Sequence, residues 1–146
     1  MMSMRFVIAA LYACGCVDLS EPPGWVAAGD YINTAVECRQ TADPGACERI
    51  RTAWDRNYTD ALSGSYDAQR TISFCLSTGC EQAIREDRTL GCAWRLVISG
   101  SGHPEAGETD TADRAHFCGP DMLDQQARTE AQAQSETLLK MLRKTS

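Results

Sequence analysis

The sequence predicts an all-α protein made of antiparallel helix hairpins, arranged as a short α-solenoid-like repeat array that disulfides cross-link. Apolar residues recur at helical spacings of three, four and seven residues over most of the chain. The chain contains no run of alternating β-branched residues joined by hairpin turns. Eight cysteines among 146 residues is a high number, which indicates an oxidising compartment or a metal site.

The composition narrows the class of protein further. A chain of 146 residues is long enough for one domain with a modest core, and 43% hydrophobic residues is an ordinary globular value. The formal net charge is −6, and no run of five or more basic residues occurs. The composition therefore argues against nucleic acid as a partner.

The first 16 residues have the plan of a secretory signal peptide. One cation, Arg5, precedes an apolar run over residues 6–13 that is too short to span a bilayer. The run leads to two cysteines, Cys14 and Cys16, and resembles the lipobox of bacterial lipoproteins. Cys16 is favoured as the lipidated residue because six cysteines then remain for three disulfides, and Cys14 is the alternative. We expect a periplasmic or cell-envelope protein held at a membrane by a lipid anchor only.

A tether and one helical-repeat domain follow the signal peptide. Residues 17–24 are mostly polar and contain a stiff pair of prolines, and the domain covers residues 25–146. A first helix is expected at the start of the domain, because three- and seven-residue spacings place four residues on one helix face. These residues are Trp25, Ala28, Ile32 and Ala35.

The next two helices have clear start and stop signals. Asp43 can cap a helix that has Pro44 at its first position. The stripe of this helix consists of Ile50, Trp54, Tyr58 and Leu62. A further helix is expected over residues 67–76, stopped by the turn at residues 77–79.

The second half of the domain is expected to hold two more helices and a long loop. Asp87 can cap a helix whose apolar side consists of Leu90, Trp94, Val97 and Ile98. Residues 100–119 are rich in Gly, Thr, Asp and Glu, and we expect a surface loop there. The last helix is expected to begin at residues 119–121. Its apolar face consists of Leu123, Ala127, Ala131, Leu138 and Leu142.

Two turns echo each other 38 residues apart, at Gly64 and Gly102. Such a period is typical of helix-turn-helix repeats. Over residues 68–106 the chain resembles the Sel-one-like repeat family, relatives of the tetratricopeptide repeats. The matching positions are Ala68-Gln69, Ile72-Ser73, Gly79, Ile84-x-x-Asp87, Gly91-x-x-Trp94 and Gly102-His103-x-x-Ala106.

This resemblance implies stacked helix hairpins whose groove holds another protein or a peptide. Small residues let two helices approach closely, and Trp94 fills the space between hairpins. Arg95 departs from the family pattern, which usually has tyrosine there. The residues assigned to the repeat core are Ala68, Ile72, Gly79, Gly91, Trp94 and Gly102.

The six cysteines of the domain are interpreted as disulfides. Cys38 and Cys47 flank the turn before the capped helix, which suits a bridge across a helical hairpin. For the other four, Cys75–Cys80 with Cys92–Cys118 is favoured. The pairing Cys75–Cys92 with Cys80–Cys118 is nearly as good. A zinc site is the rival interpretation, and its ligands would be His116, Cys118, Cys75, Cys80 and Cys92.

No catalytic motif is recognised in the chain. The sequence has no phosphate-binding loop, no nucleophile-elbow motif and no His-Glu-x-x-His, and it contains only two histidines. Four acidic residues of the expected long loop are interpreted as a solvated cluster rather than a calcium site. They are Glu105, Glu108, Asp110 and Asp113.

The sequence therefore favours a non-enzymatic, exported protein-binding or scaffolding module without cofactor or metal. The alternative is an accessory structural subunit of a bacterial envelope or membrane complex, which would dock through the Trp25 segment and the last helix. An enzyme or an enzyme inhibitor is a third and weaker hypothesis, supported only by the acidic cluster and by unassigned aromatic residues.

Overall fold

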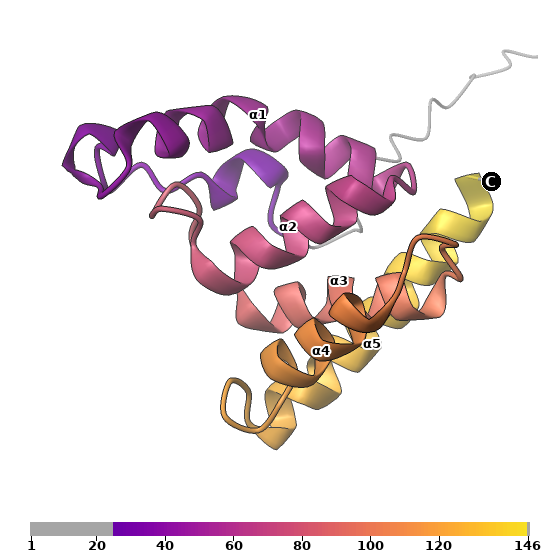
Figure 1. The fold of residues 1–146 in the computed structure, drawn as a ribbon. Helices are drawn as coiled ribbons and strands as arrows, with labels where there is room; N and C mark the ends of the chain where they lie inside the picture. Colours follow the sequence, from indigo (N-terminus) through magenta and orange to yellow (C-terminus); the bar gives the residue numbers. More distant parts are fainter. Residues whose placement is uncertain (1–24, 146) are drawn as a thin grey trace, which may run out of the picture.

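The structure, a computed structural model, describes residues 25–145, and this part of the chain is all-α (Figure 1). The predicted all-α class, with packed helix pairs and disulfides, is confirmed. Two short 3-10 helices, η1 and η2, precede five α-helices, α1 to α5. Their bounds are η1 Ala28–Tyr31, η2 Cys38–Gln40, α1 Pro44–Leu62, α2 Tyr66–Thr78, α3 Arg88–Gly100, α4 Glu108–Phe117 and α5 Gln125–Thr145. The expected signal peptide, tether and lipidation sites Cys14 and Cys16 lie outside the described residues.

The helices pack as successive pairs around α3. Helix α1 packs on α2, α2 packs on α3, and both α4 and α5 pack on α3 (Figure 1). None of the helices between residues 25 and 145 is both long and apolar enough to cross a membrane.

Two helix starts and one helix end follow the predicted signals. The Asp43 carboxylate accepts a hydrogen bond from the N–H of Ala46 at 2.9 Å, and Pro44 occupies the first position of α1. The Asp87 carboxylate accepts from the N–H of Leu90 at 2.9 Å. At the other end of α2, Gly79 has a φ of 78°, the left-handed conformation that ends helices. These local predictions are confirmed because each depends only on neighbouring residues.

The helix expected from Trp25 to Ala35 is wrong. Only η1 forms there, and Ile32 then pairs with Ile84 in an isolated antiparallel bridge. The N–H of Asn33 donates to the carbonyl of Ala83 at 2.9 Å, and the N–H of Arg85 donates to the carbonyl of Tyr31 at 2.7 Å. These long-range backbone hydrogen bonds satisfy the segment in an extended form, so the helical spacing of its apolar residues does not decide its conformation.

The long loop expected over residues 100–119 is also wrong, because α4 lies within it. The side chain of Asp110 accepts a hydrogen bond from the N–H of Gly107 at 3.1 Å, which caps the start of this helix. Helix α5 begins at Gln125 rather than at residues 119–121, and Asp124 accepts from the N–H of Ala127 at 2.8 Å. Both errors arose in segments with few apolar residues, where polar capping sets the helix bounds.

An aromatic cluster forms the centre of the core. The rings of Trp54 and Tyr58 are 6.0 Å apart, and Tyr58 meets Trp94 edge-on at 6.3 Å. Tyr31 stacks on Tyr58 at 6.3 Å. All four side chains are buried, so the cluster joins α1, α3 and the segment before α1.

Helices α2 and α3 approach very closely at Gly91. A methyl group built there would lie 2.4 Å from the hydroxyl oxygen of Ser77 and 3.1 Å from the carbonyl oxygen of Ser73. Only glycine fits this contact without displacing α2. Of the residues assigned to the repeat core, Ala68, Ile72, Gly79, Gly91 and Trp94 are buried, and Gly102 lies in an exposed turn with a φ of 69°. Membership of a repeat family stays a prediction.

Three disulfides cross-link the described chain: Cys38–Cys47, Cys75–Cys80 and Cys92–Cys118. These are the pairs that the sequence favoured, and the alternative pairing of the last four cysteines is wrong. Cys38–Cys47 ties η2 to the first turn of α1. Cys92–Cys118 ties α3 to the residue that follows α4. Because disulfides persist in oxidising compartments, three of them are consistent with an extracytoplasmic location.

Replacement of Trp94 by alanine is expected to destabilise the protein strongly. The side chain is fully buried against Tyr58, so its removal leaves a large cavity between α1 and α3. We expect a loss of about 3–5 kcal/mol in the free energy of unfolding, measured by denaturant titration.

Trp94→Phe is the matched control for this prediction. The indole Nε1–H has no hydrogen-bond partner in the structure, so phenylalanine keeps much of the packing and loses no bond. It should cost clearly less than Trp94→Ala. A loss below about 1 kcal/mol for Trp94→Ala would contradict the central position of this side chain.

Candidate functional site

A groove runs between α2 and α4, and α3 forms its floor. We call it the α2–α4 groove. It is an open hollow of about 280 Å³. Two arginines from different helices meet there, Arg70 of α2 and Arg95 of α3. The side chains that line the hollow are Asp67, Arg70, Thr71, Arg95 and Asp113.

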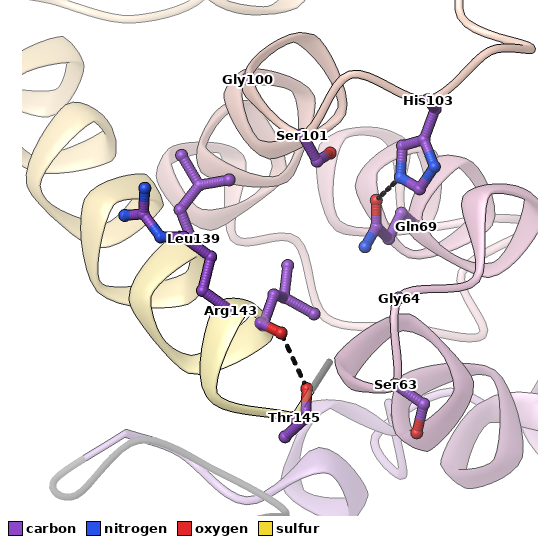
Figure 2. A pocket seen from close by; sticks show the side chains of 10 residues that line it. Ser63, Gly64, Gln69, Gly100, Ser101, His103, Leu139, Arg143 and Thr145 are labelled. Atoms are coloured by element: carbon purple, nitrogen blue, oxygen red, sulfur yellow. Dashed lines mark hydrogen bonds between the residues drawn. The ribbon is translucent and has the colours of Figure 1, made fainter.

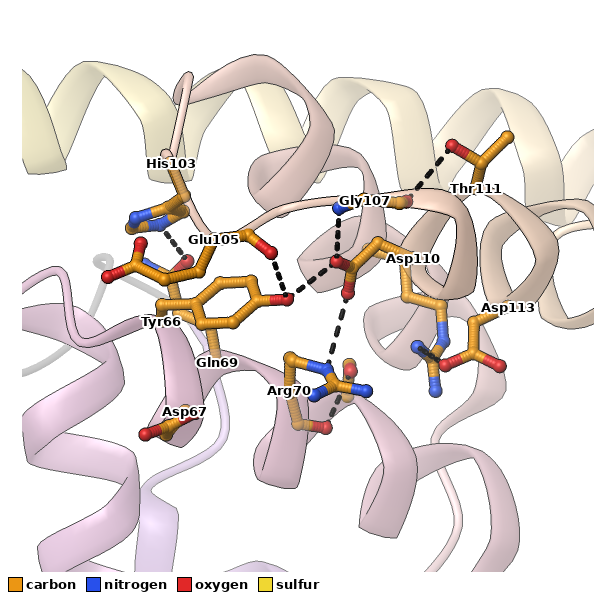
Figure 3. A network of polar contacts seen from close by, with 12 residues as sticks. Tyr66, Asp67, Gln69, Arg70, His103, Glu105, Gly107, Asp110, Thr111 and Asp113 are labelled. Atoms are coloured by element: carbon orange, nitrogen blue, oxygen red, sulfur yellow. Dashed lines mark hydrogen bonds and ion pairs between the residues drawn. The ribbon is translucent and has the colours of Figure 1, made fainter.

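A polar network crosses one end of this groove (Figure 3). The Tyr66 hydroxyl donates to Oδ2 of Asp110 at 2.6 Å, and Nε of Arg70 lies 3.3 Å from Oδ1 of the same carboxylate. The Arg70 contact is an ion pair without hydrogen-bond alignment. Asp110 is only 6% exposed, so this carboxylate is the buried centre that joins α4 to α2.

The ionised form of Asp110 is favoured despite its burial. Burial raises the pKa of this carboxyl, but hydrogen bonds from the Tyr66 hydroxyl and the Gly107 N–H lower it, and so do the charges of Arg70 and Arg95. The net effect is a pKa below the usual value of 3.8. The same hydrogen bond raises the pKa of Tyr66. The network therefore contains an ionised carboxylate and a neutral phenol at neutral pH.

Arg95 is a buried cation on the floor of the groove. Its side chain is 3% exposed, and Nη1 donates to Oδ2 of Asp113 at 3.0 Å. The guanidinium carbon lies 4.4 Å from the centre of the Phe117 ring, a cation–π contact. Its Nε–H has no hydrogen-bond partner in the structure. Burial lowers the pKa of Arg95, and the charge of Asp113 acts in the opposite direction.

Aromatic side chains lie at one edge of the groove, outside the residues that line its hollow. Phe74 of α2 is 49% exposed, and its ring meets that of Phe117 edge-on at 6.2 Å. The ring centre of His116 lies 4.7 Å from that of Phe117. Phe74 is one of two exposed large apolar side chains between residues 25 and 145, and the other is Val26. A half-exposed phenylalanine beside two arginines has the composition of a protein-contact site.

A second hollow, of about 370 Å³, lies where α1, α3 and α5 end (Figure 2). His103 Nε2 and Gln69 Oε1 are 3.0 Å apart at its edge, and Gln69 Nε2 donates to the carbonyl of Ala61 at 3.2 Å. These contacts join the two glycine turns at Gly64 and Gly102. We interpret this pair as structural, because both polar ends of the buried Gln69 amide have partners.

The predicted acidic cluster divides in the structure. Glu105 and Glu108 are exposed, as expected for solvated residues. Asp110 and Asp113 face the groove and pair with arginines, so their assignment to a solvated loop is wrong. The spacing of Asp110, Asp113 and Phe117 is that of one helix face, and this signal could have placed them together. Arg70 and Phe74 were missed because their partners lie on a helix that the sequence analysis did not expect.

The ligands of the rival zinc interpretation do not gather around a site. Cys75, Cys80, Cys92 and Cys118 are bonded in pairs, so none offers a free thiolate. Across residues 25–145 no three side chains of His, Cys, Asp or Glu come together as a metal site.

Comparison with protein-family models, with curated proteins and with solved structures found no match to this chain.

Stability is expected to fall in acid because of Asp110. The pKa of Asp110 is lower in the folded protein than in the unfolded chain, where it is near 3.8. Its contribution to the free energy of unfolding is therefore fully present above the unfolded pKa and is lost as the pH falls through the folded pKa. Asp110→Asn should lose about 1–3 kcal/mol of unfolding free energy at neutral pH and should weaken this acid dependence.

Glu108→Gln is the control for this experiment. It removes an exposed carboxylate from the same turn of α4. Denaturant unfolding of both variants between pH 7 and pH 3 is the measurement. Equal pH profiles for Asp110→Asn and Glu108→Gln would contradict the assigned network.

Proposed function

We propose that this protein is a non-enzymatic, exported binding module whose α2–α4 groove holds a segment of another protein or a peptide. The observation that carries the proposal is the combination of Phe74 and Arg95. The groove offers a half-exposed phenylalanine beside a buried guanidinium with an unpaired Nε–H. Aromatic and arginine side chains in such positions supply most of the energy of protein contacts.

The chemistry of the groove favours an acidic partner segment with an apolar side chain next to its carboxylate. Arg70 has 40% of its side chain exposed, and Arg95 lines the same hollow. A partner carboxylate would share these guanidiniums with Asp110 and Asp113, and its apolar neighbour would cover Phe74. Arginine is suited to this task because its planar N–H groups match a carboxylate.

Selection of peptides on the purified full chain tests this proposal. A random peptide library should yield sequences in which Asp or Glu adjoins an aliphatic or aromatic residue. Phe74→Ala should weaken the selected peptides about tenfold or more, because it removes the apolar contact without opening the core. Lys140→Ala, on the exposed face of α5, is the control that should leave binding unchanged.

Thr71 offers a matched pair of charge variants for the same assay. It is exposed at the rim of the hollow, and its hydroxyl bonds only locally, to the carbonyl of Asp67. An acidic segment should bind about threefold or more weakly to Thr71→Glu and more tightly to Thr71→Arg. Binding that Phe74→Ala leaves unchanged, or the opposite order of the two charge variants, would contradict the assignment of this groove.

The proposal includes export and a lipid anchor at Cys16, with Cys14 as the alternative. The signal-like segment before residue 17 supports it, together with the three disulfides. The mature protein from its native host should be lighter by the signal peptide and heavier by a diacylglycerol. Intact mass spectrometry measures both changes. An unmodified chain that begins at Met1 would contradict this part of the proposal.

The alternative, an accessory subunit of an envelope complex, draws less support from the same residues. Its docking surfaces would be the Trp25 segment and the last helix. The apolar residues of α5, which include Ala131, Leu138 and Leu142, are buried in the domain's own core. Trp25 is partly buried against that core. These surfaces therefore offer a partner little apolar area.

A further inference from the structure

The turn that follows α2 has an unusual backbone. Cys80, Glu81 and Gln82 have φ angles of 42°, 56° and 60°, and they are the non-glycine residues with positive φ between residues 25 and 145. Residues with a Cβ are strained in this left-handed region, and three in succession require an external constraint. The disulfide between Cys75 and Cys80, five residues apart, closes this turn onto the last part of α2.

The strained turn positions the hydrogen bonds that join residues 82–85 to the amino-terminal segment. The carbonyl of Gln82 accepts a hydrogen bond from Nδ2 of Asn33 at 3.0 Å, and the carbonyl of Ala83 accepts from the N–H of Asn33 at 2.9 Å. The N–H of Arg85 then donates to the carbonyl of Tyr31 at 2.7 Å. The first of these hydrogen bonds uses the carbonyl of Gln82, the last left-handed residue of the turn. The conformation of the turn therefore decides whether these hydrogen bonds form.

The amino-terminal segment in turn covers the aromatic residues of α1. The carbonyl of Ala28 accepts a hydrogen bond from Nε1 of Trp54 at 2.8 Å. Tyr31 is buried and stacks on Tyr58. Release of residues 28–36 would therefore uncover the aromatic cluster at the side of α1.

We propose that the Cys75–Cys80 disulfide is a redox-sensitive latch. Its reduction by a dithiol lets residues 80–82 leave the left-handed conformation and releases residues 28–36 from α1. Cys80 is half-buried and gives a reductant a point of attack, whereas Cys75 is only 2% exposed. Both cysteines of Cys38–Cys47 are buried, so that bridge offers no such point. Cys118 of the third bridge is half-buried like Cys80, but only Cys80 lies in the left-handed turn.

The reduction balances as a thiol–disulfide exchange. A thiolate of the dithiol attacks Sγ of Cys80, forms a mixed disulfide and expels the Cys75 thiolate, which takes up a proton. The second thiol of the reductant then attacks its own mixed disulfide and releases Cys80 as a thiol. The reductant ends as a cyclic disulfide, and two electrons and two protons have passed to the protein.

Hydrogen exchange at two backbone amides tests the latch. In the oxidised full chain, the N–H groups of Asn33 and Arg85 are hydrogen-bonded and should exchange slowly. In the Cys75→Ser/Cys80→Ser variant they should exchange at least tenfold faster, while the amides of α5 stay unchanged. Equal protection in the variant and the parent chain would overturn the proposal.

Substitutions at the strained positions separate the latch from a general loss of stability. Glu81→Gly/Gln82→Gly relieves the left-handed strain and keeps the carbonyl of residue 82, so in the serine background it should slow the exchange of both amides again. Glu81→Ala/Gln82→Ala is the matched control, because it removes the same side chains and keeps the strain. Recovery with alanine equal to that with glycine would overturn the proposal.

Graded reduction of the parent chain keeps the test open where the serine variant fails to fold. Increasing dithiothreitol, followed by alkylation and peptide mass mapping, should find Cys75 and Cys80 modified before the four cysteines of the other two disulfides. This partly reduced species should have fast exchange at Asn33 and Arg85. Earlier opening of Cys92–Cys118, or slow exchange at both amides after Cys75–Cys80 has opened, would overturn the latch.

Discussion

The burial of α3 is the constraint on which the rest of the structure depends. Helices α2, α4 and α5 all pack on it. Trp94 fills the space toward α1, and Gly91 brings α2 within contact distance. Arg95 turns toward α4. Gly91, Trp94 and Arg95 are three and four residues apart, so they lie on one face of this 13-residue helix, and that face sets the places of α2, α1 and α4.

The polar side of α3 explains why a groove exists. Asp110 is the one residue of α4 that is fully buried, so this helix has almost no apolar face with which to close onto α2. Ion pairs to Arg70 and Arg95 hold it in place instead. Because long arginine side chains reach across to the carboxylates of α4, helices α2 and α4 stay apart. An open hollow lined by Arg70 and Arg95 remains between them. Arg95 therefore supplies a buried positive charge to the floor of the groove.

Sequence reasoning succeeded where local chemistry decides the structure and failed where distant contacts do. The caps at Asp43 and Asp87 and the stripe around Trp94 depend on residues within one or two turns of a helix, so the sequence carries them directly. The segment before α1 takes its conformation from backbone groups some fifty residues later in the chain. Helix α4 is held by charges from two other helices. The spacing of apolar residues along the sequence therefore could not show that Arg70 and Phe74 belong to the candidate site.

Under the proposed function, the outer helices α1 and α5 restrict where a partner would bind. A repeat array grows when an apolar face at its end stacks on the next unit, and a polar end face stops this growth. The outer side of α1 has exposed Arg49, Thr52 and Arg56, and α5 has exposed Lys140 on its outer side. Neither end is suited to stacking, and the apolar face of α5 is already buried. The exposed Phe74 lies instead on the flank, beside the arginines of the groove, so a partner gains most buried apolar area by lying along the flank.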